Sequence, residues 1–214
     1  MSSPAFGRVL DHVGAAVVAG DLPAGTRTSV EALVEQTLAS RSIVREATRV
    51  LVALGLLTAG PRVGLVVQPA ERWNLLDPHV VRWRLAGPDR AAQVRELTEL
   101  RAAVEPVAAR AAARRADTAT RNRLRDLAAA FTDAPGEFAR WDAALHEELL
   151  RAGGNPMVRT LGAVVALAVR DRADVPPRRL DVRLHADLAQ AVADGDEGRA
   201  GDLVARIVRR TSGP

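Results

Sequence analysis

The chain has 214 residues, of which 48% are hydrophobic, so it can bury a substantial core in one or two domains. Its formal net charge is only +4, which argues against a general nucleic-acid coat protein. Cysteine is absent, which excludes disulfides and thiolate metal sites. No apolar run approaches the roughly 20 residues of a membrane span, and no signal peptide is recognisable. We therefore expect a cytoplasmic protein.

In the first third of the chain, residues 40–57 read as an amphipathic helix. Ser40 provides the hydroxyl typical of an N-cap, and Gly55 stands where a left-handed residue ends a helix. Apolar residues recur at steps of three and four, as in a core-facing stripe: Ile43, Val44, Ala47, Val50, Leu51 and Leu54. The other face carries arginines spaced four apart: Arg41, Arg45 and Arg49. Taken alone, this pattern favours an ordinary helix with a solvated arginine face.

The neighbouring segments change that interpretation. A shorter helical segment, 30–38, precedes the arginine stripe, is entered through Thr28 and Ser29, and leaves only a residue or two for the turn. Two short apolar runs, 56–59 and 65–68, follow it around a Gly/Pro turn and predict a hairpin. A helix-turn-helix followed by a hairpin is a winged helix-turn-helix. The hairpin tip carries Arg62 and Gly64, which could enter a minor groove.

This N-terminal third resembles the GntR family of bacterial transcription regulators. The matching motifs are Gly20-Asp21-Leu22-Pro23-Ala24-Gly25, then Ser40-Arg41-Ser42-Ile43-Val44-Arg45-Glu46-Ala47, then Leu51 to Leu56 with the wing Gly60 to Gly64. The resemblance implies that Ser40, Arg41, Ser42 and Arg45 meet phosphates or base edges and that Gly64 lies at the wing tip. Arg49 and Arg62 complete our candidate DNA contacts. Only Glu46 opposes the arginines of this region, so electrostatic attraction to DNA is modest and useful affinity needs two copies of the module.

Two positions depart from the family pattern. Glu31 stands where family members often carry an arginine, which removes one phosphate contact. Leu38 and Ala39 replace the usual glycine before the recognition helix, so we expect a slightly different turn.

The remainder of the chain is predicted to be helical. We divide it into a winged domain at 1–70, a linker with a first helix at 71–89, and an all-helical domain at 90–214. Helices are expected at 76–86, 90–115, 118–132, 136–152, 156–173, 177–193 and 196–210. The fold class is therefore mostly α, with a small β-hairpin wing.

The helical region resembles the FCD domain, the C-terminal ligand-binding domain of the FadR-like branch of the GntR family. The motifs that carry this resemblance are 97–106, the Asp142 to His146 pair that closes on 153–156, and 184–188. The stretch 73–83 looks like the linker of members that respond to sugar acids such as galactonate or gluconate. The resemblance implies a homodimer that binds double-stranded DNA and a small carboxylate effector.

A metal site is one interpretation of Asp142 and His146. Four residues apart on a helix, they project from one face, where an Asp–His hydrogen bond is the commoner arrangement. The family pattern adds His185 as a ligand and a further histidine on the last helix, where this chain has Ile207. Three outcomes stay open: a weakly held metal with more water, a metal completed by effector oxygens, or no metal. Zinc, nickel and manganese are all candidates.

The effector site is assigned to Arg101, Asp142, His146, Asn155 and His185. Arg101 could grip a carboxylate through two hydrogen bonds, or could instead pair with Glu105 at a helix surface. Trp141 is assigned to the core, and the isolated His12 and His79 to surface or linker positions.

Three functions follow from these observations. The first is a ligand-responsive regulator, most simply a repressor released by its effector. The second is a hydrolase that uses a metal held by Asp142, His146 and His185, with Glu147 or Glu148 as its base. The third is an architectural DNA-binding protein without an effector. The winged module favours the regulator over the enzyme.

Overall fold

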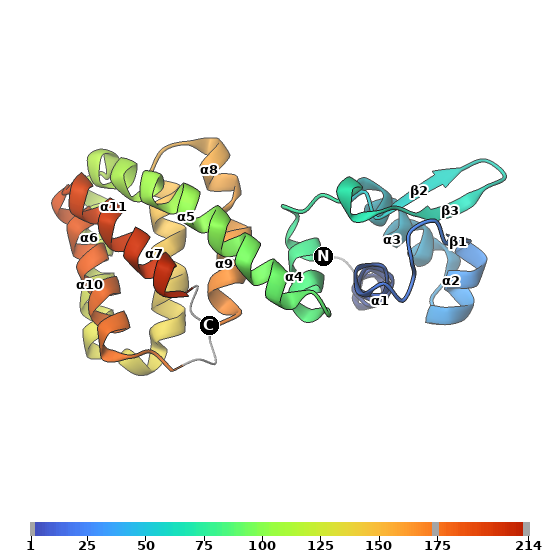
Figure 1. The fold of residues 1–214 in the computed structure, drawn as a ribbon, viewed down its shortest axis with the longest axis horizontal. Helices are drawn as coiled ribbons and strands as arrows, with labels where there is room; N and C mark the ends of the chain where they lie inside the picture. The colour runs from blue at the N-terminus through green and yellow to red at the C-terminus, as the bar shows by residue number, and fades with distance from the viewer. Residues whose placement is uncertain (1–2, 173–175, 212–214) are drawn as a thin grey trace. The chain divides into compact units, whose positions relative to one another are not determined.

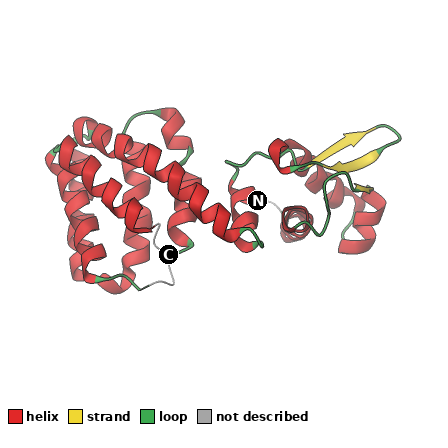
Figure 2. Ribbon diagram, in the orientation of Figure 1, coloured by secondary structure: helices red, strands yellow, loops and turns green. Residues whose placement is uncertain are grey.

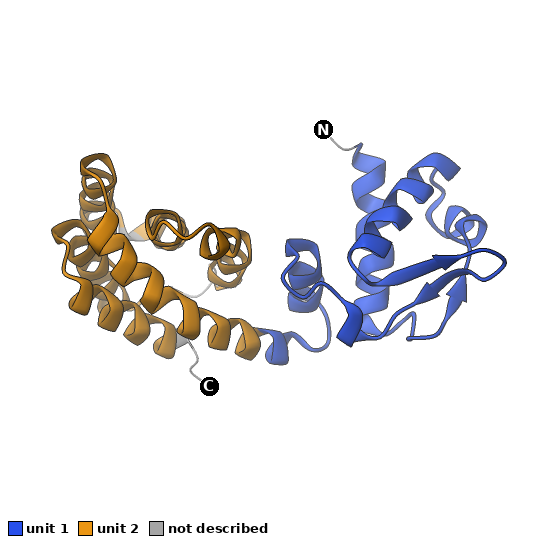
Figure 3. Ribbon diagram, turned by 90° about the horizontal axis from the view of Figure 1, so that it is seen from above, with its two compact units in different colours: residues 1–93 blue, residues 94–214 orange. Residues whose placement is uncertain are grey.

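The computed structural model describes residues 3–172 and 176–211 and divides into two compact units, 1–93 and 94–214 (Figure 3). In unit 1 the helices are α1 (Pro4–Ala19), α2 (Val30–Thr37), α3 (Arg41–Ala53) and α4 (Pro78–Ala86), with the 3-10 turn η1 (Ala70–Arg72) (Figure 1). Its strands are β1 (Arg27–Thr28), β2 (Leu57–Gly60) and β3 (Gly64–Val67). The winged helix-turn-helix expected from sequence is confirmed.

Local capping explains where α2 and α3 begin. The Ser29 hydroxyl accepts a hydrogen bond from the Ala32 amide at 3.1 Å, and the Ser40 hydroxyl accepts one from the Ile43 amide at 3.4 Å. Helix α2 ends at Leu38, whose φ of 52° is left-handed and whose side chain is 91% exposed. A leucine in this conformation costs about 1 kcal/mol relative to the glycine usually found there. The turn before α3 is thus left-handed although no glycine stands there.

The three strands form one antiparallel sheet in the order β1-β3-β2 (Figure 2). The predicted hairpin is β2 and β3, paired from Leu57 opposite Val67 to Gly60 opposite Gly64. Strand β1 was not predicted, because two residues cannot establish an alternating pattern. Gly64 has a φ of 76°, and a Cβ at this position would lie 2.8 Å from the Thr28 carbonyl oxygen of β1. A glycine is therefore needed for the sheet itself.

Helix α4, the first helix of the predicted segment 71–89, packs against α1 within unit 1. The Trp83 ring covers Gly14, where a Cβ would lie 2.3–2.5 Å from ring atoms. The Trp83 indole N–H donates to Asp11 at 2.9 Å, and Arg82 pairs with the same carboxylate oxygen at 2.5 Å. Val80 and Trp83 join the core that α1, α3 and the sheet share.

The helices of unit 2 are α5 (Arg90–Arg115), whose first residues belong to unit 1, α6 (Thr118–Asp133), α7 (Phe138–Ala152), α8 (Pro156–Thr160), α9 (Gly162–Arg170), α10 (Arg179–Asp194) and α11 (Glu197–Thr211). A 3-10 turn, η2 (Pro135–Glu137), precedes α7. The mostly helical class is confirmed, but the single helix expected at 156–173 is wrong. Two helices meet at Leu161, because the chain turns before Gly162; residue 173 itself lies outside the described residues.

Alanine and leucine side chains build the core of unit 2. Helix α10 packs along α6 and α11, while α7 packs against α9 and α6. Small side chains such as Ala109, Ala112 and Ala113 let α5 approach this core closely. Trp141 packs against the same core, as expected. Among the described residues, no helix combines the length and the apolarity that a membrane crossing requires.

Candidate functional site

The outer face of α3 presents the predicted DNA contacts to solvent. All seven predicted side chains or backbone positions are exposed: Ser40, Arg41, Ser42, Arg45, Arg49, Arg62 and Gly64. The inner face, with Val44, Ala47 and Leu51, is completely buried. The exposed arginines therefore do not serve the fold of unit 1, so the structure leaves them available to a ligand.

One of these arginines has an acidic partner. Arg41 lies 3.2 Å from Glu31 on α2, and both side chains are more than half exposed. The backbone at Glu31 and the nearby Arg41 lower the pKa of the Glu31 carboxyl, although slight burial opposes them. Ser40 and Ser42 hydrogen-bond to each other at 3.0 Å. Glu31 thus has two effects: it replaces a basic side chain, and its carboxylate partly neutralises Arg41.

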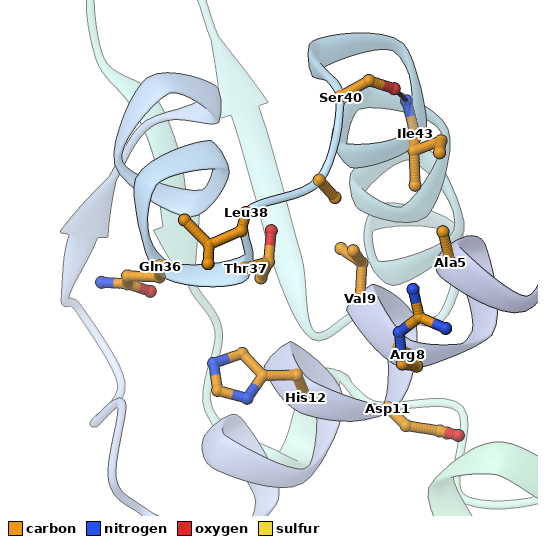
Figure 4. A pocket seen from close by; sticks show the side chains of 11 residues that line it. Ala5, Arg8, Val9, Asp11, His12, Gln36, Thr37, Leu38, Ser40 and Ile43 are labelled. Atoms are coloured by element: carbon orange, nitrogen blue, oxygen red, sulfur yellow. Dashed lines mark hydrogen bonds between the residues drawn. The ribbon is translucent and has the colours of Figure 1, made fainter.

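A pocket of about 700 Å³ also lies in unit 1, between α1 and the turn from α2 to α3 (Figure 4). Its wall includes Arg8 and His12 from α1, and Thr37 and Leu38 from the turn. It contains no cluster of buried titratable groups, and its charged side chains are exposed. The chemistry expected of a small-molecule site lies instead in unit 2.

In unit 2, the structure brings Asp142, His146 and His185 together. Asp142 and His146 stand one turn apart on α7, and His185 comes from α10; one ligand atom from each lies within 4.8 Å of the others. The Asp142 Oδ1 lies 3.1 Å from His146 Nε2 and 3.2 Å from His185 Nε2. Both histidines are nearly completely buried, and the Asp142 side chain is 18% exposed. These are the three ligands predicted from the sequence.

The hydrogen bonds around the two imidazoles orient them toward Asp142. His185 Nδ1 lies 2.6 Å from the Asp181 carbonyl oxygen, which can only accept, so this nitrogen carries the proton. The other ring nitrogen, His185 Nε2, is the one that faces the cluster, 3.2 Å from Asp142 Oδ1. Phe138 holds the same ring edge-on, with a centroid separation of 4.9 Å. This is how metal-binding imidazoles are usually oriented.

The hydrogen-bond geometry within the cluster is incomplete. Asp142 Oδ1 is buried and close to both imidazoles, yet no contact has the directions of a hydrogen bond. Such an orphaned buried oxygen is costly unless something else satisfies it. Two imidazole nitrogens and a carboxylate oxygen converging on one point are a suitable donor set for a divalent transition metal. The residues present therefore fit a metal ion.

A buried ion pair lies behind His146. Arg101 and Glu105 of α5 are 3% and 0% exposed and are joined at 2.6 Å between Nε and Oε1. Glu105 Oε2 is also 2.9 Å from His146 Nδ1, and Arg101 Nη2 is 3.4 Å from His146 Nε2. The pairing of Arg101 with Glu105 was one of two sequence alternatives. It is formed, but in the interior and not at a helix surface.

Charge interactions in this cluster dominate over burial. Burial raises the pKa of Glu105, but His146 and Arg101 outweigh it and lower that pKa to about 2. Burial lowers the pKa of His146, but the Glu105 charge and contact with Asp142 raise it to about 9. Burial likewise opposes ionisation of Asp142, but His146 and His185 bring its pKa well below the usual range. The apo cluster is therefore an interlocked set of charges.

The other predicted site residues lie elsewhere. Asn155 is exposed, and its Oδ1 accepts a hydrogen bond from the Met157 amide at 3.0 Å, so capping of α8 accounts for it. Ile207 on α11 is 2% exposed within the apolar core and supplies no ligand atom. Sequence reasoning missed the contact of Glu105 with His146, although the four-residue spacing of Arg101 and Glu105 was noted.

Comparison with known proteins identifies both units. The model of "bacterial regulatory proteins, gntR family" matches residues 7–67, and the FCD domain model matches residues 96–210. The chain is 29% identical to the galactonate operon transcriptional repressor of Escherichia coli K12 over 221 residues, which covers 95% of each protein.

Solved structures agree with this fold. The Listeria monocytogenes regulator Lar aligns with a TM-score of 0.62 at 14% identity, covering 99% of this chain and 96% of that one. A GntR protein of Streptococcus agalactiae aligns with a TM-score of 0.52 at 18% identity, covering 97% and 98%. The family matches also decide against the hydrolase, since this is a family of regulators and not of enzymes. The chain belongs to the GntR family of DNA-binding transcription regulators, in the FadR-like branch that carries a C-terminal FCD domain.

Proposed function

We propose that the protein is a homodimeric repressor that leaves its operator when its FCD domain binds a small carboxylate such as a sugar acid. The observation that carries this proposal is the combination, in one chain, of an exposed arginine-lined recognition helix and a buried Asp-His-His cluster. The relative that represses a galactonate operon supports the effector class. Dimerisation follows from the modest local charge of a single winged module.

In the proposed complex, α3 lies in the major groove. Ser40, Arg41 and Ser42 would meet the DNA at the N-terminus of the helix, where backbone N–H groups also favour phosphate. Arg45, one turn further on, has the reach for a base edge or phosphate, and Arg49 follows it along the backbone. Arg62, at the exposed tip of the hairpin, would enter the minor groove.

In unit 2, Asp142, His146 and His185 would hold a divalent metal, with zinc, nickel and manganese as candidates. A bound metal would supply a Lewis acid that binds carboxylate and hydroxyl oxygens. Ile207 takes the place of a fourth ligand, so three protein ligands would leave positions open for effector oxygens. Glu105 would hold the Nδ1 proton of His146 and direct its Nε2 toward the metal. Arg101 lies beside that nitrogen, where it would meet a bound carboxylate.

Gel-shift titration against the DNA upstream of the protein's own gene tests the regulator. We expect a specific shift that galactonate or another hexonate reverses. Arg45→Ala should abolish the shift, while Arg125→Ala, which removes an exposed arginine from α6, should leave it unchanged. An Arg45→Ala variant that binds as tightly as the parent would refute our assignment of the recognition helix. A parent shift that no hexonate reverses would refute the effector class.

Calorimetric titration with zinc, nickel and manganese tests the metal. We expect one ion per chain for the parent and none for His146→Ala, with circular dichroism confirming that the variant is folded. His79→Ala is the matched control, because it removes an imidazole that lies in α4, outside the cluster. Equal, negligible heats for the parent and for His146→Ala would end the metal hypothesis and leave the cluster as a polar lining for the effector.

A further inference from the structure

Arg8 is an exposed arginine of α1 that the fold of unit 1 does not use. Among residues 3–172 and 176–211, its side chain forms no hydrogen bond and no ion pair. Asp11 on the same helix does not neutralise it, because the Asp11 carboxylate already binds Arg82 at 2.5 Å and the Trp83 indole N–H at 2.9 Å. The positive charge of Arg8 is therefore available to a ligand.

The pocket between α1 and the turn before α3 lies in front of Arg8 (Figure 4). His12, one turn along the same face of α1, lines this pocket together with Arg8, and Ser40 lines it from the start of α3. Val9, the neighbour of Arg8, is 2% exposed and belongs to the core that α1 shares with α3. Packing thus holds the face that carries Arg8 beside the N-terminus of the recognition helix.

Ser40 joins this pocket to the proposed DNA contacts. Its hydroxyl caps α3, and the same residue forms part of the pocket wall. A helix fills a major groove about 12 Å wide, so a phosphate backbone runs along each side of it. A strand whose phosphate meets Ser40 should therefore pass the opening of the pocket, where Arg8 supplies a positive charge.

We propose that a backbone phosphate of the operator occupies this pocket and is bound by Arg8, which extends the DNA contact from α3 and the wing to α1. The inference rests on the proposed placement of α3 in the major groove. A small acid is the poorer occupant, because the three titratable residues of the wall, Arg8, Asp11 and His12, are all exposed, whereas small-molecule sites enclose most of their ligand. A phosphate contact positions the protein on the duplex and reads no base.

Fluorescence anisotropy over a salt series tests the inference on the full chain, with operator DNA and with a random duplex of the same length. Arg8→Ala should weaken binding to both duplexes by a similar factor, about three- to tenfold, because a phosphate contact carries no sequence information. The slope of log affinity against log salt concentration should become shallower by about one for each Arg8 lost. Arg8→Lys should retain part of the affinity, since an ammonium group also binds phosphate.

Neutral methylphosphonate linkages, placed one at a time along the operator, identify the phosphate itself. The linkage that Arg8 meets should weaken binding of the parent but not of Arg8→Ala. Arg72→Ala is the matched control, because it removes an exposed arginine of unit 1 at the opposite end of α3, where the Arg72 carbonyl oxygen faces Gly55. It should stay close to the parent in affinity and in salt dependence.

An Arg8→Ala variant that keeps the affinity and the salt dependence of the parent would overturn the role of Arg8 and leave the proposed function intact. An unchanged salt slope together with an altered oligomeric state, measured by analytical ultracentrifugation, would also overturn it and assign the pocket to a contact between two copies of the chain. If the parent itself binds no DNA, the proposed function fails, and this inference with it.

Discussion

Glu31 competes with the DNA phosphates for the guanidinium of Arg41. Arg41 is a proposed phosphate contact, and its guanidinium must leave Glu31, 3.2 Å away, or share itself between the carboxylate and a phosphate. The carboxylate also adds a negative charge next to the DNA backbone. Both effects oppose binding, and they repeat in each subunit of a dimer.

We therefore predict that Glu31→Gln raises operator affinity by about threefold. It should also make affinity fall more steeply with salt concentration, because one more arginine per subunit becomes free to displace counterions. Fluorescence anisotropy over a salt series measures both quantities. Glu35→Gln removes an exposed carboxylate from the same helix and should change affinity less. If both variants bind alike, the effect is one of general charge and not of the Glu31–Arg41 pair.

His146 makes metal binding dependent on pH. Burial lowers its pKa, but Glu105 and Asp142 raise it from 6.5 to about 9. The protonated ring therefore stabilises the apo fold below pH about 6.5, and this contribution disappears as pH rises through about 9. A metal on Nε2 must displace that proton, so metal affinity should rise over the same range.

At about pH 7.5, each metal bound should release about one proton from His146, compared with roughly a tenth of a proton for an imidazole of ordinary pKa. Calorimetry in buffers of different ionisation enthalpy measures this number. Glu105→Gln removes the negative charge that stabilises the His146 imidazolium, so this variant should release fewer protons per metal ion bound. Release that is negligible in the parent would contradict the raised pKa of His146.

Among the elements, the packing of α4 on α1 depends on the absence of a side chain at Gly14. A Cβ there would lie 2.3–2.5 Å from the Trp83 ring, which is 4% exposed and hydrogen-bonded to Asp11 at 2.9 Å. The ring is rigid and enclosed, so it must move as a whole to admit a methyl group. α4 would move with it or lose its contact with α1.

Gly14→Ala should therefore destabilise unit 1 by about 1–3 kcal/mol despite the better helix propensity of alanine. Gly7→Ala is the matched control: it lies in the same helix, and a Cβ there has no atom within 4 Å. It should stabilise by about 0.5–1 kcal/mol. Thermal unfolding and Trp fluorescence follow both variants. Similar effects of the two substitutions would contradict the Trp83 contact.

The sequence predicted those elements that local chemistry specifies. Ser40 caps α3, Gly55 ends it, and the two apolar runs form the hairpin. β1 was missed because its two residues acquire strand geometry only by pairing with β3. The break at Leu161 was missed because no proline lies at the break, and a single glycine, Gly162, does not by itself end a predicted helix.

In the candidate site, too, the sequence predicted local features and missed those that depend on packing. Asp142 and His146 share a helix, so their spacing indicated their proximity, and the family resemblance added His185. The burial of Arg101 and Glu105 behind His146 could not be predicted, because it depends on how α5 packs against α7.

For the molecule as a whole, the two units have separable tasks. The recognition helix and its capping lie entirely in unit 1, and the Asp-His-His cluster lies entirely in unit 2. Loss of a cluster residue should therefore leave operator binding intact. An effector can act on DNA binding only if it binds more tightly to one state of the dimer than to the other.

His185→Ala should accordingly bind the operator with the affinity of the parent but fail to respond to whichever acid releases the parent. Linkage requires the reciprocal effect in the parent: bound operator should weaken that acid by the same factor by which the acid weakens DNA, typically about 5–150-fold. Anisotropy with labelled operator measures one side of this cycle, and calorimetry of the acid with and without operator measures the other. Unequal factors would show that the acid acts through something other than the two-state dimer, and a His185→Ala variant still released by the acid would place the effector outside the cluster.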